Sequence, residues 1–144
     1  MEKFSGYIVL EDSIVYGKLI IKDGKIKDIV SLKEDVAAPK TYIMAGFIDQ
    51  HIHGASGCDA MDATFNSINT ISKAILKEGV TSFLATTMTA SSNSIEAAIN
   101  NVVTNKDKVT GANLLGVHLE GPFISPKYKG AQPEEHIIPF DLDK

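Results

Sequence analysis

The chain has 144 residues, of which 44% are hydrophobic and 22% are charged, and its formal net charge is −4. This composition is typical of a globular protein with room for one ordinary domain, and it argues against disorder. The charges are interspersed and no apolar run approaches the roughly 18 residues of a membrane span, so we expect neither a nucleic-acid nor a membrane partner. The single cysteine, Cys58, excludes an internal disulfide and favours a reducing compartment, which predicts a cytoplasmic protein.

The first 45 residues carry only β signals. Runs of apolar and β-branched residues predict strands over 7–10, 14–22, 25–30 and 41–44. Asp23-Gly24, between the second and third runs, predicts a tight hairpin turn. The polar segment 31–40 is predicted to be a connection. We therefore predict a small β domain over residues 1–45.

From residue 46 the pattern alternates between strands and helices. The predicted strands cover 46–53, 80–88 and 113–119. Thr64 is placed to cap a first helix with the apolar stripe Phe65, Ile68, Ile71 and Ile75, ending at Gly79. Asn93 and Glu96 have the spacing of a capping box for a second helix, with the stripe Ile95, Ala98, Ile99, Val102 and Val103. Strands joined by helices in this way are parallel, which predicts an α/β domain over residues 46–144.

Two histidines stand at the end of the first of these strands. His51 and His53 are separated by one residue, so a strand points both imidazoles to the same side. Neutral imidazole is a common ligand of transition metals. A His-x-His pair at a strand end is also found as a structural or surface pair, and both interpretations remain open on this motif alone.

A carboxylate follows the third strand. Glu120 comes after an apolar run and directly before Gly121-Pro122. Alone, such a glutamate is more often an acid in a turn. Together with His51 and His53 on a successive strand of the same pattern, it predicts a metal site.

Two folds fit these parallel strands, an open doubly wound sheet and a closed (β/α)8 barrel. His51, His53, the Thr86-Thr87 pair and Glu120 all lie at the carboxyl ends of predicted strands. In a barrel those ends form the catalytic face, to which several strands contribute one or two groups each. An open sheet binds at the same ends, but the segment after the first strand lacks a glycine-rich phosphate loop. The pattern therefore favours a barrel.

Four segments together resemble the N-acetylglucosamine-6-phosphate deacetylases of the amidohydrolase superfamily. They are 46–54 (GFIDQHIHG), 81–89 (TSFLATTMT), 118–127 (HLEGPFISPK) and 130–133 (GAQP). The resemblance covers the whole chain. It implies that residues 1–45 are part of a small β-sandwich domain, and that 46–144 are the first three βα units of a (β/α)8 barrel.

The resemblance also implies roles for individual residues. Glu120 matches the carboxylate that holds the catalytic metal, and His51 and His53 match a pair that some members use for a second metal. Ala131 and Gln132 match a loop that contacts the sugar near its N-acetyl group. The implied cofactor is a divalent metal, zinc, iron or similar, with one or two ions per site. The implied reaction, in amino-sugar catabolism, splits N-acetylglucosamine 6-phosphate into glucosamine 6-phosphate and acetate.

Other parts of the family's site have no counterpart in these 144 residues. The family takes two further histidine ligands and a general acid/base aspartate from later strands, so no catalytic residue is assigned here. His118 is expected in a supporting position, and His136 in a solvated loop or at a helix start. We therefore expect an incomplete N-terminal portion of an enzyme that, at full length, is a homodimer acting on a small amino-sugar phosphate.

Two alternatives remain. The chain could begin another amidohydrolase of the dihydroorotase or aminoacylase kind, against which the Glu120 segment argues. It could also be a non-catalytic metal-binding module of three βα units, against which its unpaired edge strands argue.

Overall fold

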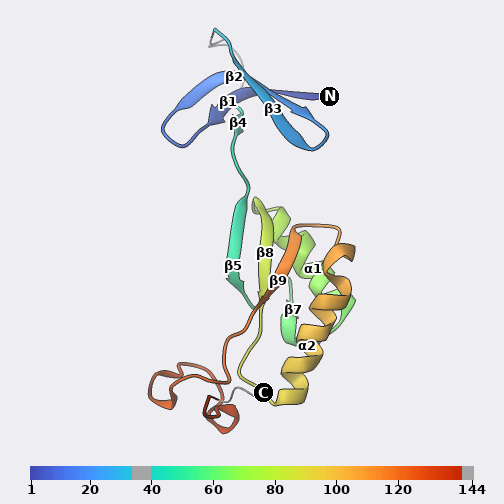
Figure 1. The fold of residues 1–144 in the computed structure, drawn as a ribbon, viewed down its shortest axis with the longest axis vertical. Coiled ribbons are helices and arrows are strands. Elements are labelled where there is room, and N and C mark those ends of the chain that lie inside the picture. Colours follow the sequence, from blue (N-terminus) through green and yellow to red (C-terminus); the bar gives the residue numbers. More distant parts are fainter. Residues whose placement is uncertain (34–39, 141–144) are drawn as a thin grey trace. The chain divides into compact units, whose positions relative to one another are not determined.

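Contacts divide the chain into two units, Met1–Ala45 and Gly46–Lys144, in the computed structural model, which describes residues 1–33 and 40–140 (Figure 1). Most of the connection predicted over 31–40 lies outside the described residues. Within the described residues, no helix has both the length and the apolar character that crossing a membrane requires.

The first unit is a four-stranded sheet. Its strands are β1 (Glu2–Val9), β2 (Ile14–Lys22), β3 (Lys25–Ser31) and β4 (Tyr42–Ile43), in the order β3-β2-β1-β4. The predicted Asp23-Gly24 turn is confirmed, since both residues have positive φ, 53° and 71°, between antiparallel β2 and β3. The prediction of a first strand over 7–10 was too short. Glu2 lies opposite Ile21, because pairing with the long β2 extends β1 through a polar segment that has no apolar run of its own.

The second unit is built on three parallel strands, β5 (Phe47–Ile52), β8 (Val80–Thr86) and β9 (Asn113–His118), in the order β5-β8-β9. Both pairs, β5 with β8 and β8 with β9, are parallel. Helix α1 (Phe65–Leu76) connects the first pair and α2 (Ser92–Asn105) the second. The predicted mixed α/β class is therefore confirmed, and the three strands end at the same edge of the sheet (Figure 1).

The core of this unit lies between the sheet and the two helices. Its buried members from α1, β8, α2 and β9 are Ile68, Ile71, Ile75, Phe83, Ala85, Val102 and Leu114. The predicted stripes were right for most positions and wrong at their margins. Phe65 is 42% exposed and Val103 70% exposed, because each lies at the edge of the helix face that meets the sheet.

The caps of the two helices differ in how well local sequence predicts them. Thr64 caps α1 as expected, and its Oγ1 accepts a hydrogen bond from the Ser67 N–H at 3.1 Å. The Asn93–Glu96 capping box is wrong. Ser91 caps α2 instead, and its Oγ accepts from the Ser94 N–H at 3.3 Å, so Asn93 already lies inside the first turn.

Short elements connect β5 to α1. They are β6 (Gly54–Ala55), β7 (Cys58–Asp59) and the 3₁₀ turn η1 (Ala60–Asp62). The Ala60 N–H donates to the His53 carbonyl at 2.8 Å, which ties the residue after β5 to this turn. The Asp59 N–H donates to the Asp62 carboxylate and lowers the pKa of Asp62. Further 3₁₀ turns are η2 (Lys106–Lys108), η3 (Pro126–Tyr128) and η4 (Glu134–His136).

Thr64→Ala is expected to loosen the start of α1. Removal of a threonine N-cap costs about 1 kcal/mol, so the Ser67 amide should exchange its hydrogen roughly fivefold faster. Hydrogen exchange of the full-length protein would measure the exchange rate of the Ser67 amide. Thr104→Ala is the control, since Thr104 is exposed within α2 and alanine favours a helix interior. Equal rates at Ser67 in both variants would contradict the capping role.

Candidate metal centre

The carboxyl ends of β5 and β9 bring three side chains together. His51 lies in β5, His53 follows it, and Glu120 stands two residues beyond β9. The Asp49 carboxylate accepts a hydrogen bond from the His51 N–H at 3.0 Å, at the place where the pairing of β5 with β8 is irregular between Asp49 and Ile52. The parallel pairing of β5, β8 and β9 carries Glu120 to the same edge, although 67 or more residues of sequence separate it from the histidines.

The nitrogen and oxygen atoms of this group converge on one point. His53 Nε2 lies 2.9 Å and His51 Nε2 3.3 Å from Glu120 Oε2, and the two Nε2 atoms are 3.3 Å apart. All three atoms lie within 4.8 Å of one another. The three residues predicted from the sequence to be metal ligands are thus adjacent in space.

These separations fit a shared cation. Zinc about 2.0–2.1 Å from each of three tetrahedral ligands sets the ligand atoms roughly 3.3 Å apart. Glu120 Oε2 is buried and has no hydrogen-bond partner among the described residues, although two imidazole nitrogens lie beside it. Two imidazole nitrogens and one carboxylate oxygen that converge in this way are a ligand set that divalent transition metals take.

The group remains partly open to solvent. The side chain of His51 is 49% exposed, that of His53 31%, and that of Glu120 29%. The site is therefore reachable by water or a small molecule. Such a half-open arrangement suits a reactive metal site better than a closed structural one.

His118 supports this group from outside it. Its Nδ1 lies 2.9 Å from the Gln50 carbonyl oxygen, and its ring packs edge-on against His51, with 4.5 Å between the ring centres. His118 is not among the three converging residues, in agreement with the supporting position expected from the sequence. The last expected histidine, His136, ends the η4 turn.

Gln132 and Ala131, predicted to contact substrate, have different environments. Ala131 is exposed, whereas Gln132 is only 5% exposed. Gln132 Oε1 accepts a hydrogen bond from the Thr89 N–H at 2.7 Å, and Nε2 donates to Met88 Sδ at 3.6 Å. The side chain of Gln132 is therefore engaged within the protein. Its main chain is engaged too, since its N–H donates to the Lys129 carbonyl at 3.0 Å and its carbonyl accepts from Lys129 Nζ at 3.3 Å. No local sequence signal pointed to the Gln132–Thr89 contact, because 43 residues separate the two.

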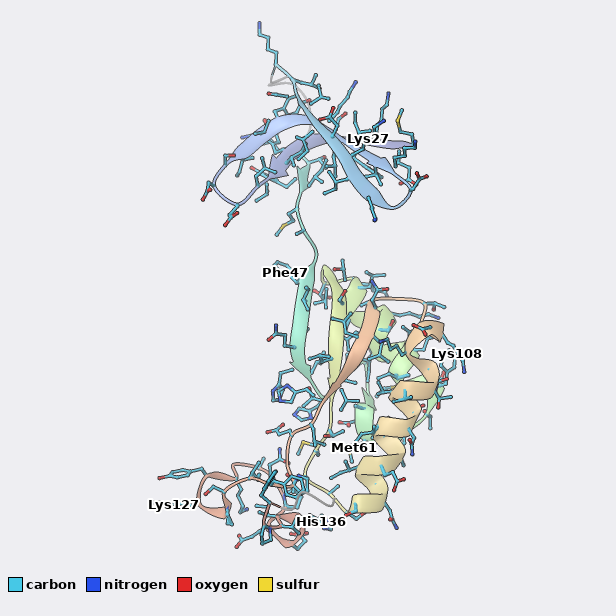
Figure 2. All side chains as sticks on the ribbon, in the orientation of Figure 1. Lys27, Phe47, Met61, Lys108, Lys127 and His136 are labelled. Carbon is cyan, nitrogen blue, oxygen red and sulfur yellow. The ribbon has the colours of Figure 1, made fainter. Side chains whose placement is uncertain are left out.

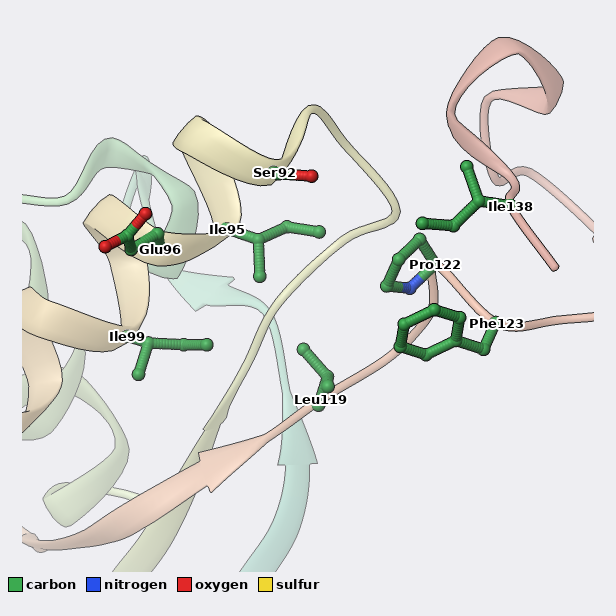
Figure 3. A pocket seen from close by; sticks show the side chains of 8 residues that line it. All are labelled: Ser92, Ile95, Glu96, Ile99, Leu119, Pro122, Phe123 and Ile138. Carbon is green, nitrogen blue, oxygen red and sulfur yellow. The ribbon is translucent and has the colours of Figure 1, made fainter. Parts of the chain in front are cut away.

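An apolar pocket of about 480 Å³ lies apart from these residues, between the first turns of α2 and the segment after β9 (Figure 3). Its lining residues are Ser92, Ile95, Glu96, Ile99, Leu119, Pro122, Phe123 and Ile138. None of them belongs to the His51–His53–Glu120 group, and no cationic side chain is present to bind a phosphate. The pocket is therefore not the site of the chemistry expected from the sequence.

Comparisons with known proteins point to one family. A sequence profile described as the amidohydrolase family matches residues 42–141. An N-acetylglucosamine-6-phosphate deacetylase of Bacillus subtilis is 41% identical over 148 residues, covering 94% of this chain and 37% of the relative. One from Vibrio furnissii is 50% identical over 94 residues, covering 65% of this chain and 24% of the relative.

A solved structure gives the same result for the fold. The crystal structure of an N-acetylglucosamine-6-phosphate deacetylase from Thermotoga maritima superposes with a TM-score of 0.81 at 33% identity. The superposition covers 99% of this chain and 38% of that structure. The chain thus spans less than two fifths of the length of each of these relatives.

Proposed function

Because the chain belongs to the amidohydrolase family, we propose that it carries the metal-binding part of an enzyme that deacetylates N-acetylglucosamine 6-phosphate. The products are glucosamine 6-phosphate and acetate, and the reaction belongs to amino-sugar catabolism. The observation that carries the proposal is the convergence of His51 Nε2, His53 Nε2 and Glu120 Oε2 within 4.8 Å. The names of the Bacillus and Vibrio relatives support the choice of substrate.

In this proposal the three side chains divide the work of holding a divalent cation. Glu120 supplies the negative charge that offsets the charge of the ion. His51 and His53 supply neutral nitrogen ligands, with the ring of His51 held by His118. A divalent cation at such a site polarises an acyl oxygen and lowers the pKa of bound water towards neutrality. Zinc and iron both suit nitrogen and carboxylate ligands, and we propose that the site holds one or two such ions.

The substrate is proposed to meet the loop that carries Ala131. The side chain of Gln132 fixes this loop to Thr89, so the loop has a defined position relative to the end of β8. We propose that Ala131 and Gln132 contact the sugar near its N-acetyl group. Transfer of a proton to the departing amine is assigned to an aspartate outside the 144 residues.

The wider architecture belongs to the same proposal. Residues 1–45 are proposed to be part of a small β-sandwich domain, and 46–144 the first βα units of a (β/α)8 barrel. Strand order β5-β8-β9 follows the chain, as every strand of a barrel does, and the candidate site lies at the carboxyl ends. A cytoplasmic homodimer is proposed for the whole enzyme.

Removal of the metal is expected to abolish deacetylation. A chelator such as dipicolinate should stop the full-length protein from releasing acetate from N-acetylglucosamine 6-phosphate. Added Zn²⁺ or Fe²⁺ should restore this activity. Acetate would be measured by a coupled assay, and bound metal by mass spectrometry of the same samples.

Alternative substrates sharpen this test. N-acetylgalactosamine 6-phosphate and dihydroorotate are the controls, the first for the sugar epimer and the second for another amidohydrolase activity. Faster turnover of either would contradict the proposed substrate. Bound metal without turnover of any of the three compounds would instead favour a metal-binding module.

A further inference from the structure

Thr87 lies where the ends of β8 and β9 separate, and its contacts point to a function. It is 1% exposed, and its N–H donates to the His118 carbonyl at 3.0 Å. The last paired residues of the two strands are Thr86 and His118, so this bond extends the pairing by one residue beyond the end of β8. The side chain of Thr87 is thereby brought close to the first residues that follow β9.

The hydroxyl group of Thr87 bonds directly to the main chain of Glu120. Its Oγ1 accepts a hydrogen bond from the Glu120 N–H at 3.3 Å. Glu120 stands outside β9, and the sheet hydrogen bonds that end at His118 do not hold its N–H. Among the described residues, Thr87 Oγ1 is the hydrogen-bond acceptor for that N–H.

A second contact holds the segment that carries Thr87. Two residues further along, the Thr89 N–H donates to the buried amide oxygen of Gln132 at 2.7 Å. Residues 87–89 are thus tied to the chain after β9 at two points, Glu120 and Gln132. These two hydrogen bonds restrain residues 87–89 relative to the chain that follows β9.

We propose that Thr87 is a positioning residue that places the carboxylate of Glu120 at the metal site. This inference rests on the proposed function, because it takes Glu120 as a metal ligand. Metal–ligand distances tolerate deviations of only about 0.2 Å, so a small shift of the Glu120 main chain moves Oε2 away from the two imidazole nitrogens. Thr87 acts through Glu120 and touches neither metal nor substrate.

Thr87→Val tests the proposal, because valine keeps the shape of threonine and removes the hydroxyl acceptor. We expect Zn²⁺ affinity to fall about tenfold, as is typical for the loss of a group that orients a metal ligand. The cobalt-substituted protein should show an altered visible absorption spectrum. Thr87→Ser keeps the hydroxyl and should bind Zn²⁺ within about twofold of the unsubstituted protein.

Thr89→Val is the matched control. Thr89 is also 1% exposed, but its hydroxyl has no hydrogen-bond partner among the described residues, and valine leaves its N–H in place. We expect unchanged Zn²⁺ affinity and an unchanged cobalt spectrum. All variants would be prepared in the full-length protein, and their Zn²⁺ affinity would be measured by competition with a chromophoric chelator.

Each outcome decides between this proposal and its alternatives. Equal Zn²⁺ affinities for Thr87→Val and Thr89→Val, with the unsubstituted protein binding metal, would overturn the role of Thr87 and leave the proposed function standing. Absence of metal binding by the unsubstituted protein would overturn both. If Thr87→Val fails to fold, hydrogen exchange in the unsubstituted protein decides, because the proposal requires a protected Glu120 amide. A freely exchanging Glu120 amide would overturn it.

Discussion

Glu120→Gln is expected to remove most deacetylase activity from the full-length protein. The amide is nearly the same size as the carboxylate but carries no charge, and a neutral amide is a poorer ligand for a divalent cation. We expect turnover of N-acetylglucosamine 6-phosphate to fall by more than about 100-fold, beyond the loss typical of residues that only support a ligand. Bound metal should fall in parallel, because Glu120 is the acidic member of the group.

The control for this prediction is Glu78→Gln. Glu78 is an exposed residue that lies before the start of β8, at the opposite end of the strand from the site. It loses the same charge without touching the metal group, so activity and metal content should stay unchanged. Near-normal turnover with normal metal content in Glu120→Gln would rule out the role proposed for Glu120.

The second large effect concerns residues 1–144 produced by themselves. We expect this chain neither to deacetylate the sugar phosphate nor to behave as a soluble monomer. Its metal group offers three side-chain ligands among the described residues. The family resemblance predicts further histidines and a proton-transferring aspartate that are not among these residues. We therefore expect residues 1–144 to lack the groups needed to activate water and to protonate the departing amine.

The three-stranded sheet explains the expected association. β5 and β9 are its edges within the described residues, and each carries exposed apolar side chains. Phe47, at the start of β5 (Figure 2), is 57% exposed, Ile48 is 60% exposed and Leu115 is 46% exposed. Burial of apolar surface stabilises by roughly 25 cal/mol per Å², so such edges favour pairing with other chains. Light scattering and a hydrophobic dye would detect the association.

Ile48→Lys offers a specific control on this explanation. Lysine on an edge strand opposes strand pairing between molecules, so this variant should associate less and bind less dye. Val103→Lys should have no such effect, because Val103 is 70% exposed on α2 and not on an edge strand. A monomeric chain with a sharp thermal transition and measurable acetate release would contradict both halves of the prediction.

Local sequence patterns determined most elements of the fold. The Asp23-Gly24 turn, the Thr64 cap and the bounds of β2 follow from interactions between residues close in sequence, so the sequence predicted them correctly. The pairing of His51 with His53 is of the same kind, since a strand repeats its side-chain direction every second residue. The cap of α2 shows the limit of such patterns. Serine and asparagine are both favourable N-cap residues, so composition alone does not separate Ser91, which caps α2, from Asn93, which was predicted.

Only the tertiary structure decided how distant residues meet. Glu120 reaches the two histidines because β5, β8 and β9 pair in parallel and end at one edge, and no short-range pattern contains that register. Gln132 is a second case, because packing buries its side chain against Thr89, which is 43 residues away in sequence. Hydrogen bonds such as those of Thr87 and Gln132 depend on distances of about 3 Å between segments far apart in sequence, and these are set only when the whole unit packs.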